Sequence, residues 1–261
     1  MAQLDVSATS RVPFTRLVRV ELRKARDTRA GLWLLAAIIG LLVVVPGIAL
    51  IITLVRTDPV LLDDFVAIAA YMMSFLLPIL AIMLVTAEWS QRSALVTFAL
   101  EPRRSRVIWA KMAAALLLTV INLVAALVVG VVFTAVCEVV QPEQTTWRLD
   151  GGNVAGFFVT ASLAMLGGFA IATLLINTPA SIVLFVVYRF VLPGVFAALS
   201  ALSGAFEKVA PWLDFQAAQG DIYEWTMSGA EAWGHLIVSG LIWLALPLGL
   251  GMWRILRAEV K

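Results

Sequence analysis

The sequence holds few residues that could carry out covalent or metal chemistry. It has one histidine, His235, and one cysteine, Cys137. A single histidine cannot supply the histidine pair of a metal site, and a single cysteine cannot form an intramolecular disulfide. The string Gly-x-x-x-x-Gly-Lys-Ser/Thr, whose amides and lysine hold the phosphates of ATP, does not occur. We therefore expect no catalytic residue, no metal site and no bound cofactor, and a chain that is not itself an enzyme.

Arg189 is the only charged residue between positions 151 and 206. An arginine deep in an apolar helix needs compensation from water, backbone carbonyls or an anion, so we expect Arg189 to face a cavity or a transport pathway. Pro193 could free such carbonyls. The alternative is that the helix starts later in the chain and Arg189 lies at the membrane surface. The apolar stretches contain no carboxylate, which disfavours aspartyl proteolysis and a carboxylate proton relay.

Residues 88–111 combine a short apolar segment with a basic cluster. Leu95, Phe98 and Ala99 would share one face of a short helix that ends near Glu101-Pro102. Such an amphipathic helix could dock a soluble partner. A solvated connector that merely retains positive charge would have the same composition, so composition leaves both interpretations open.

The elements that must position these residues are transmembrane helices. The chain is 62% hydrophobic and 14% charged, with a mean hydropathy of +0.97. A soluble domain is about half apolar and about a quarter charged. Uncharged runs occur at residues 30–55, 65–87, 112–137 and 232–253. The stretch 151–206 is long enough for two crossings of about 20 residues each, and we expect a hairpin at Asn177-Thr178-Pro179. The sequence thus predicts an all-α membrane protein with six transmembrane helices, in a single domain over residues 1–261.

Positive charge predicts the orientation of these helices. The N-terminal segment, the 88–111 loop and the C-terminal segment carry 15 of the 19 Lys and Arg residues. The three segments on the opposite side carry 3 and hold most of the acidic residues. Because cytoplasmic loops retain Lys and Arg, we expect both termini and the 88–111 loop in the cytoplasm, and residues 56–64, 138–150 and 205–231 outside.

Residues 11–29 predict an amphipathic helix before the first span. Apolar residues recur at helical spacing, and four arginines lie mainly on the other side. We expect this elbow helix to lie flat on the cytoplasmic face, its apolar side in the bilayer boundary. It could be a simple anchor, or it could join the first span to a moving part below it.

Three segments resemble those of type-2 ABC transporter permeases. The segment Glu21-Leu-Arg-Lys-Ala-Arg26 resembles the opening elbow helix of that family. Glu88, Ser93, the short helix, Pro102-Arg-Arg-Ser-Arg106 and Ala110-Lys111 are similar to its cytoplasmic coupling loop. The C-terminal segment 246–260 resembles its last helix and basic tail. Arg92-Ser93 stands where many relatives have a Gly-Thr pair.

The resemblance implies a coupling helix that fits a groove of a separate ATPase subunit, which binds the ATP and Mg. The implied coupling residues are Glu88, Arg92, Leu95, Phe98, Pro102, Arg103, Arg104 and Arg106. Residues 205–231 would hold short helices that dip back towards the membrane, although a plain external loop has equal support from the sequence.

The function expected from this resemblance is that of the membrane-spanning subunit of an ABC exporter. Its partners would be the ATPase, a second permease subunit (identical or homologous) and the lipid bilayer of a bacterial plasma membrane, and no nucleic acid. The apolar spans favour a hydrophobic or amphipathic cargo such as a drug, an antibiotic or a lipid. The alternative is a subunit of a secondary transporter or channel, disfavoured by the missing acid and by the lack of a recognisable inverted repeat.

Overall fold

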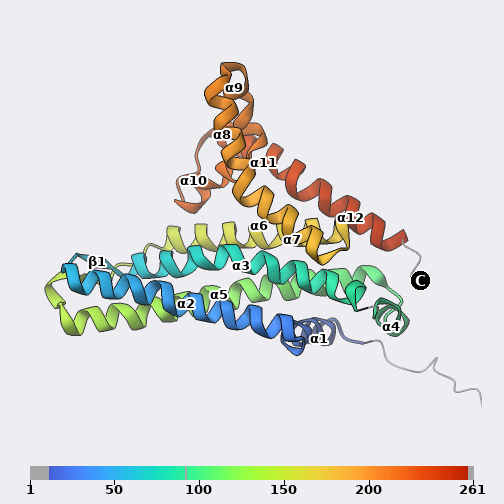
Figure 1. Ribbon diagram of the computed structural model, residues 1–261, viewed down its shortest axis with the longest axis horizontal. Coiled ribbons are helices and arrows are strands. Elements are labelled where there is room, and N and C mark those ends of the chain that lie inside the picture. The colour runs from blue at the N-terminus through green and yellow to red at the C-terminus, as the bar shows by residue number, and fades with distance from the viewer. Residues whose placement is uncertain (1–11, 92, 258–261) are drawn as a thin grey trace, which may run out of the picture.

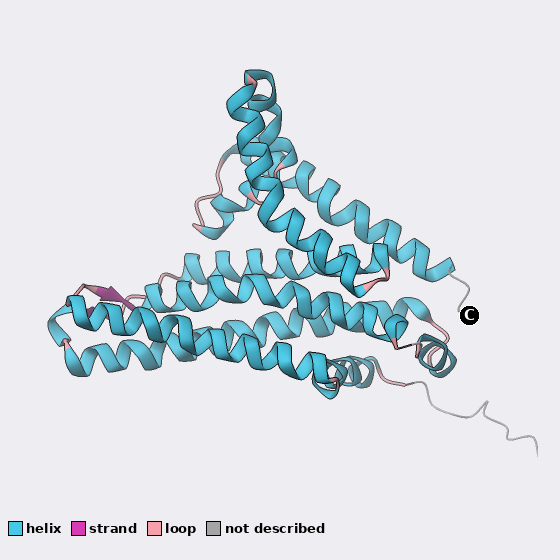
Figure 2. Ribbon diagram, in the orientation of Figure 1, coloured by secondary structure: helices cyan, strands magenta, loops and turns pink. Residues whose placement is uncertain are grey.

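The structure, a computed structural model, describes residues 12–91 and 93–257, and these residues are almost entirely helical (Figure 2). A short helix α1 (Phe14–Asp27) comes first. The first four long helices are α2 (Arg29–Arg56), α3 (Leu62–Ser90), α5 (Arg104–Val140) and α6 (Gly151–Leu175). The short helix α4 (Ala94–Leu100) lies between α3 and α5.

Each of the last two long helices is interrupted by one π-helical segment. The fifth consists of α7 (Thr178–Val186), η2 (Val187–Val191) and α8 (Leu192–Leu202). The sixth consists of α11 (Gly229–Gly240), η4 (Leu241–Ala245) and α12 (Leu246–Arg257).

Six helices are long and apolar enough to cross a membrane, which confirms the predicted all-α, six-span architecture. The chain is a multi-pass membrane protein. The predicted hairpin is also confirmed, because α6 ends at Leu175 and α7 begins at Thr178. Asn177 begins this turn, and its side chain accepts a hydrogen bond from the backbone N–H of Ala180 at 3.0 Å.

Helices α2, α3, α5 and α6 run side by side as a bundle, whereas the fifth and sixth helices diverge from it towards α8 and α11 (Figure 1). Helix α3 contacts α2, α5 and α6 and contributes much of the core. At Gly168 of α6, an added Cβ would lie 2.6 Å from the carbonyl oxygen of Pro78 in α3. This position therefore requires glycine, which lets the two helices approach closely.

The two ends of the bundle are built differently. At one end, strand β1 (Val60–Leu61) pairs in parallel with β2 (Thr145–Thr146), which follows the short helix η1 (Pro142–Gln144). At the other end lie α1, α4 and the end of α12 (Figure 1). We call these the β1 end and the α4 end.

The first and last described segments both lie at the α4 end. The guanidinium of Arg106 donates to the carbonyl of Val12 at 2.8 Å, and that of Arg104 donates to the carbonyl of Ile255 at 3.0 Å. An even number of spans requires this arrangement, and it agrees with the prediction that the three most basic segments share one side.

The elbow helix differs from the prediction in what its apolar side contacts. Val18, Glu21 and Ala25 of α1 are buried against the protein, and α1 contacts α2, α3 and α5. Phe14 remains exposed. The predicted burial in the bilayer boundary is therefore wrong for the Val18–Ala25 stripe, because that stripe carries an acid whose partners are in the protein.

Residues between the fifth and sixth helices are mostly helical rather than a plain loop. They form α9 (Gly204–Leu213), η3 (Ala217–Gln219) and α10 (Gly220–Tyr223). Helix α10 contacts α6, where Gly156 leaves no room for a Cβ beside the carbonyl oxygens of Ile222 and Tyr223. The segment after α9 thus folds back onto the bundle; that its helices dip back towards the membrane stays a prediction.

Candidate functional site

Four charged side chains form a closed cluster at the α4 end. Lys24 of α1 places its Nζ 2.7 Å from Glu21 Oε1 and 2.6 Å from Glu88 Oε1. Lys111 of α5 places its Nζ 2.7 Å from Glu21 Oε2 and 3.2 Å from Glu88 Oε1. Two carboxylates therefore share two ammonium groups, and the cluster is neutral overall. We call these four residues the charge cluster.

The charge cluster is mostly withdrawn from solvent. Glu21 and Glu88 are each 3% exposed and Lys111 is 4% exposed, while Lys24 is partly exposed. Burial lowers the pKa of Lys24, but the carboxylates of Glu21 and Glu88 raise it more, so that its pKa lies above the usual value. Buried charges are tolerated only when they are paired and hydrogen-bonded, which every member of this cluster is.

Through Thr97, the cluster connects α1 with three consecutive elements, α3, α4 and α5. Glu21 and Lys24 come from α1, Glu88 from the end of α3, and Lys111 from the first turns of α5. Thr97 of α4 donates its hydroxyl to Glu88 Oε1 at 3.1 Å. Lys111 also donates to the carbonyl of Leu84 at 3.1 Å. The elbow helix, α4 and the ends of two spans are therefore held together by one set of charge-assisted hydrogen bonds.

Helix α4 presents two different sides. Phe98 is partly buried, with its ring centroid 6.3 Å from that of Trp89 and 5.0 Å from the guanidinium carbon of Arg104. Leu95, Val96 and Leu100 are 52%, 62% and 77% exposed. Phe98 anchors α4 to the bundle, whereas Leu95, Val96 and Leu100 are exposed and form what we call the outer side. That Leu95 and Phe98 dock a partner stays a prediction.

The basic residues after α4 mostly hold the chain in place. Arg104 packs on Phe98 and bonds to the end of α12, as described above. Arg106 forms a 2.8 Å ion pair with Glu101, besides its bond to Val12. Pro102 and Arg103 are exposed. Arg92, a predicted coupling residue, lies outside the described residues.

Arg189 lies within the fifth transmembrane helix, as predicted, and not at its start. It is the twelfth residue of the 25-residue segment Thr178–Leu202, about 16 Å from its beginning at about 1.5 Å per residue. The alternative that this helix starts later is wrong. Arg189 also lies in the π segment η2, and single π turns within helices are frequent at functional sites.

The two π segments lie against each other. The ring of Tyr188 in η2 is 5.0 Å from that of Trp243 in η4, and Tyr188 is buried. Trp243 donates its indole N–H to the carbonyl of Leu213 at 2.7 Å. The irregular turns of the fifth and sixth helices are thus joined to each other and to the end of α9.

The side chain of Arg189 has polar and aromatic neighbours but, among the described residues, no carboxylate partner. It donates from Nη1 to the side-chain oxygen of Gln216, and its guanidinium carbon lies 5.5 Å from the ring centroid of Phe75. Its Nε is buried without a hydrogen-bond partner among the described residues. In the described part of the chain, no Asp or Glu lies within ion-pair distance of Arg189.

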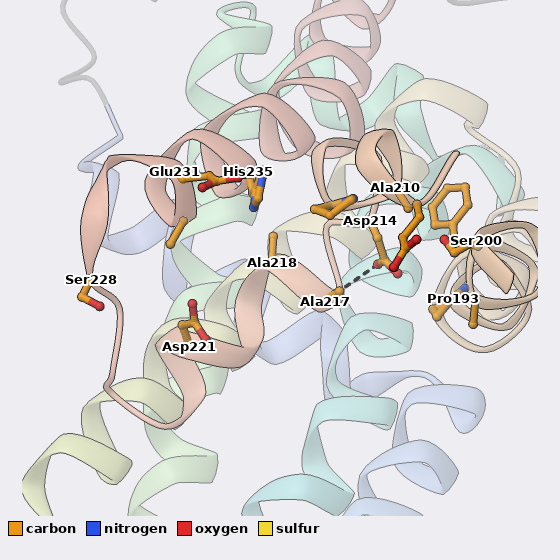
Figure 3. A pocket seen from close by; sticks show the side chains of 15 residues that line it. Pro193, Ser200, Ala210, Asp214, Ala217, Ala218, Asp221, Ser228, Glu231 and His235 are labelled. Carbon is orange, nitrogen blue, oxygen red and sulfur yellow. Dashed lines mark hydrogen bonds and ion pairs between the residues drawn. The ribbon is translucent and has the colours of Figure 1, made fainter. Parts of the chain in front are cut away.

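An acidic cavity opens between α8, α9, α10 and α11 (Figure 3). Its volume is about 560 Å³, and Glu207, Asp214, Asp221, Glu231 and His235 are among its walls. Among the described residues, none of its lining residues is Lys or Arg.

The carboxylate of Asp214 orders the turn behind this cavity. It accepts a hydrogen bond from the backbone N–H of Gln216 at 2.9 Å. It accepts a second from the backbone N–H of Ala217 at 3.0 Å, which Figure 3 shows. Asp214 thereby fixes the turn from which Gln216 reaches Arg189.

The sequence identified Glu88 as a candidate coupling residue. It did not predict that Glu88 forms one site with Glu21, Lys24, Lys111 and Thr97. A signal for Glu21 was present, because an acid three residues after Val18 falls on the apolar side of an amphipathic helix and needs a buried cation. The pairing of Arg189 with Gln216 had no such signal, because they lie 27 residues apart in the chain, with the helices α8 and α9 between them.

Comparison with known proteins adds no relative to this description. No protein-family model matches the chain, and no curated protein sequence matches it at a significant level.

Proposed function

We propose that this chain is the membrane-spanning permease subunit of an ATP-driven ABC exporter. In this proposal a separate ATPase chain binds ATP and Mg, a second permease subunit completes the transporter, and the cargo is hydrophobic or amphipathic. The α4 end faces the cytoplasm of a bacterial cell, in keeping with the 15 to 3 distribution of basic residues. The six apolar helices support a membrane transport protein, and the α4 end supports the finer assignment.

The observation that carries the proposal is the construction of α4. Its outer side exposes Leu95, Val96 and Leu100 at an end of the bundle that also carries most of the basic charge. Its inner side is fixed through Thr97 to Glu88 and through Phe98 to Trp89 and Arg104. An exposed apolar surface on a rigidly held helix is what a protein partner can dock against and push.

The charge cluster would transmit a displacement of α4 to the membrane helices. Movement of α4 acts on Glu88 through Thr97, and Glu88 is bonded to the elbow helix and to α5. Displacement of an ATPase surface would therefore move the ends of α3 and α5 together with α1. A rigid, multiply bonded junction transmits such a displacement better than a flexible loop would.

Purification of the tagged chain from its native membranes tests the proposal. We expect a P-loop ATPase to co-purify in stoichiometric amount, and the complex to hydrolyse ATP. A chain that purifies without any ATPase under mild detergent, while remaining folded, would contradict the proposal and favour a secondary transporter or a channel.

A further inference from the structure

A second cavity, smaller than the acidic one, lies beside Arg189. Its volume is about 220 Å³. Its walls come from α3, α6, η2 and the folded-back segment of η3 and α10, so that it lies where the fifth helix, the bundle and this segment meet. Arg189, Gln216, Ser74, Thr160 and Tyr223 supply polar groups, and Phe157 supplies an apolar wall.

The charge of this cavity is unbalanced. Arg189 is the only charged residue among its described lining residues, and none of them is Asp or Glu. The guanidinium has five N–H groups and cannot be deprotonated in a protein. Gln216 accepts one bond from Nη1, and Nε has no partner among the described residues. An arginine at this depth is costly unless water, a carbonyl or an anion compensates its charge, so a cavity lined by this cation is suited to an anion.

The surroundings of Arg189 are fixed in place rather than adaptable. Phe75 lies beneath the guanidinium and stacks on Phe190 with 5.2 Å between ring centroids. The turn that carries Gln216 is held by Asp214, and buried Gln219 donates its side-chain amide to the carbonyl of Phe215 at 2.7 Å. A cation that lines a cavity and is held by ordered neighbours is pre-organised to receive an anion.

We propose that this cavity binds the anionic group of an amphipathic organic anion, a carboxylate or a phosphate ester, through Arg189. The apolar part of the ligand lies along Phe157 and the neighbouring aromatic side chains. This inference rests on the proposed transport function and narrows its cargo from hydrophobic or amphipathic molecules to those that carry a negative charge. A membrane lipid head group and an anionic cargo share this chemistry.

Fluorescence titration of the full chain in neutral phosphatidylcholine nanodiscs tests the inference. The probes are 11-(dansylamino)undecanoic acid, its methyl ester and the matching primary amine, which differ only in the charge of the head. We expect the acid to bind about tenfold or more tightly than the ester, since a charge-assisted hydrogen bond is lost in the ester. Equal affinity of acid and ester, or a preference for the amine, would overturn the proposal.

Variants assign the effect to this cavity. Arg189→Gln should bring the affinity for the acid down to that for the ester, whereas Arg56→Gln, an exposed arginine at the β1 end, should leave the tenfold preference unchanged. Ala164→Phe fills the cavity and keeps Arg189, so it should weaken binding of the acid even if Arg189→Gln fails to fold. Retained preference in a folded Arg189→Gln or Ala164→Phe variant would also overturn the proposal.

A further arm identifies the source of the anion. If phosphatidylglycerol in the nanodiscs displaces the acid, the site is supported with a lipid head group as its occupant. If phosphatidylglycerol does not compete, the site is supported with a cargo anion as its occupant. Binding is measured without ATP or a partner chain, so failure here would leave a positive ATPase co-purification intact, and the reverse also holds.

Discussion

Lys111 Nζ at the start of α5 lies 2.7 Å from Glu21 Oε2 in the elbow helix, although 90 residues separate them in the chain. Both side chains are almost fully buried. Each also bonds to a second member of the charge cluster, so removal of either charge leaves its partner bonded but gives the buried cluster a net charge. This pair is therefore the most sensitive point at the α4 end.

We predict that Lys111→Met destabilises the protein by about 3–5 kcal/mol, the usual effect of removing one partner from a buried ion pair. The double variant Glu21→Gln/Lys111→Met should lose less than the sum of the two single variants, because it removes one charge of each sign. Unfolding in detergent micelles measures both. The control is Arg19→Met, an exposed cation on the same helix α1, which should change little. If the loss of stability in the double variant equals the sum of the losses in the two single variants, the charges are not coupled.

The pH dependence of Lys24 follows from the direction of its pKa shift. Folding raises the pKa of Lys24, so its charge contributes fully to stability below the usual lysine pKa of 10.5. This contribution is lost as the pH rises through the pKa of the folded state. The stability difference between the wild type and Lys24→Met should therefore be constant from about pH 6 to about pH 9 and shrink only above about pH 10.5. A decline near neutral pH would show that Lys24 is not held charged by its two carboxylates.

The outer side of α4 should be required for the ATPase. Leu95→Asp/Leu100→Asp should release the ATPase and abolish transport while the chain stays inserted, because unpaired carboxylates in an apolar groove are costly. The matched control is Val139→Asp/Val140→Asp, two exposed apolar residues at the β1 end. Co-purification of the ATPase measures the result. Phe98 is left unchanged, because it packs against the bundle. Equal recovery of the ATPase with both double variants would rule out docking on α4.

The contact of α6 with α3 gives a prediction with a neighbouring control. Gly168→Ala should destabilise the protein by about 1–3 kcal/mol, because the added Cβ meets the carbonyl oxygen of Pro78. Gly167→Ala, one residue earlier, has nothing within 4 Å of the added Cβ and should be neutral or stabilising. Thermal unfolding in detergent measures the pair, and similar effects of both substitutions would show that the close contact is absent.

Membrane orientation can be tested with single cysteines in a Cys137→Ala background. Glu143→Cys and Ser228→Cys, both at exposed positions, should react with an impermeant thiol reagent in intact cells. Arg103→Cys, exposed at the α4 end, should react only after the cells are permeabilised. The reason is the concentration of Lys and Arg at the α4 end. The opposite labelling pattern would place the α4 end outside.

The sequence by itself determined the membrane architecture. Hydrocarbon imposes a span of about 20 apolar residues, so the number of crossings and the turn at Asn177 can be read from composition and helix breakers. The depth of Arg189 follows from the same count. The sequence also predicted the elbow helix and α4, because amphipathic spacing is a local property.

Only the tertiary structure decided which polar residues meet. Glu88 and Lys111 look like surface charges in the sequence, and although Glu21 falls on the apolar side of its helix, nothing local identifies Lys111 as a cation that it meets. The charge cluster exists because α1 packs across the ends of α3 and α5, which places Glu21 within hydrogen-bond distance of a segment 90 residues away. In the same way, Phe98 faces inward and Gln216 reaches Arg189 because of long-range packing. Pairings of this kind depend on the relative placement of whole helices, which the spacing of residues along one helix does not encode.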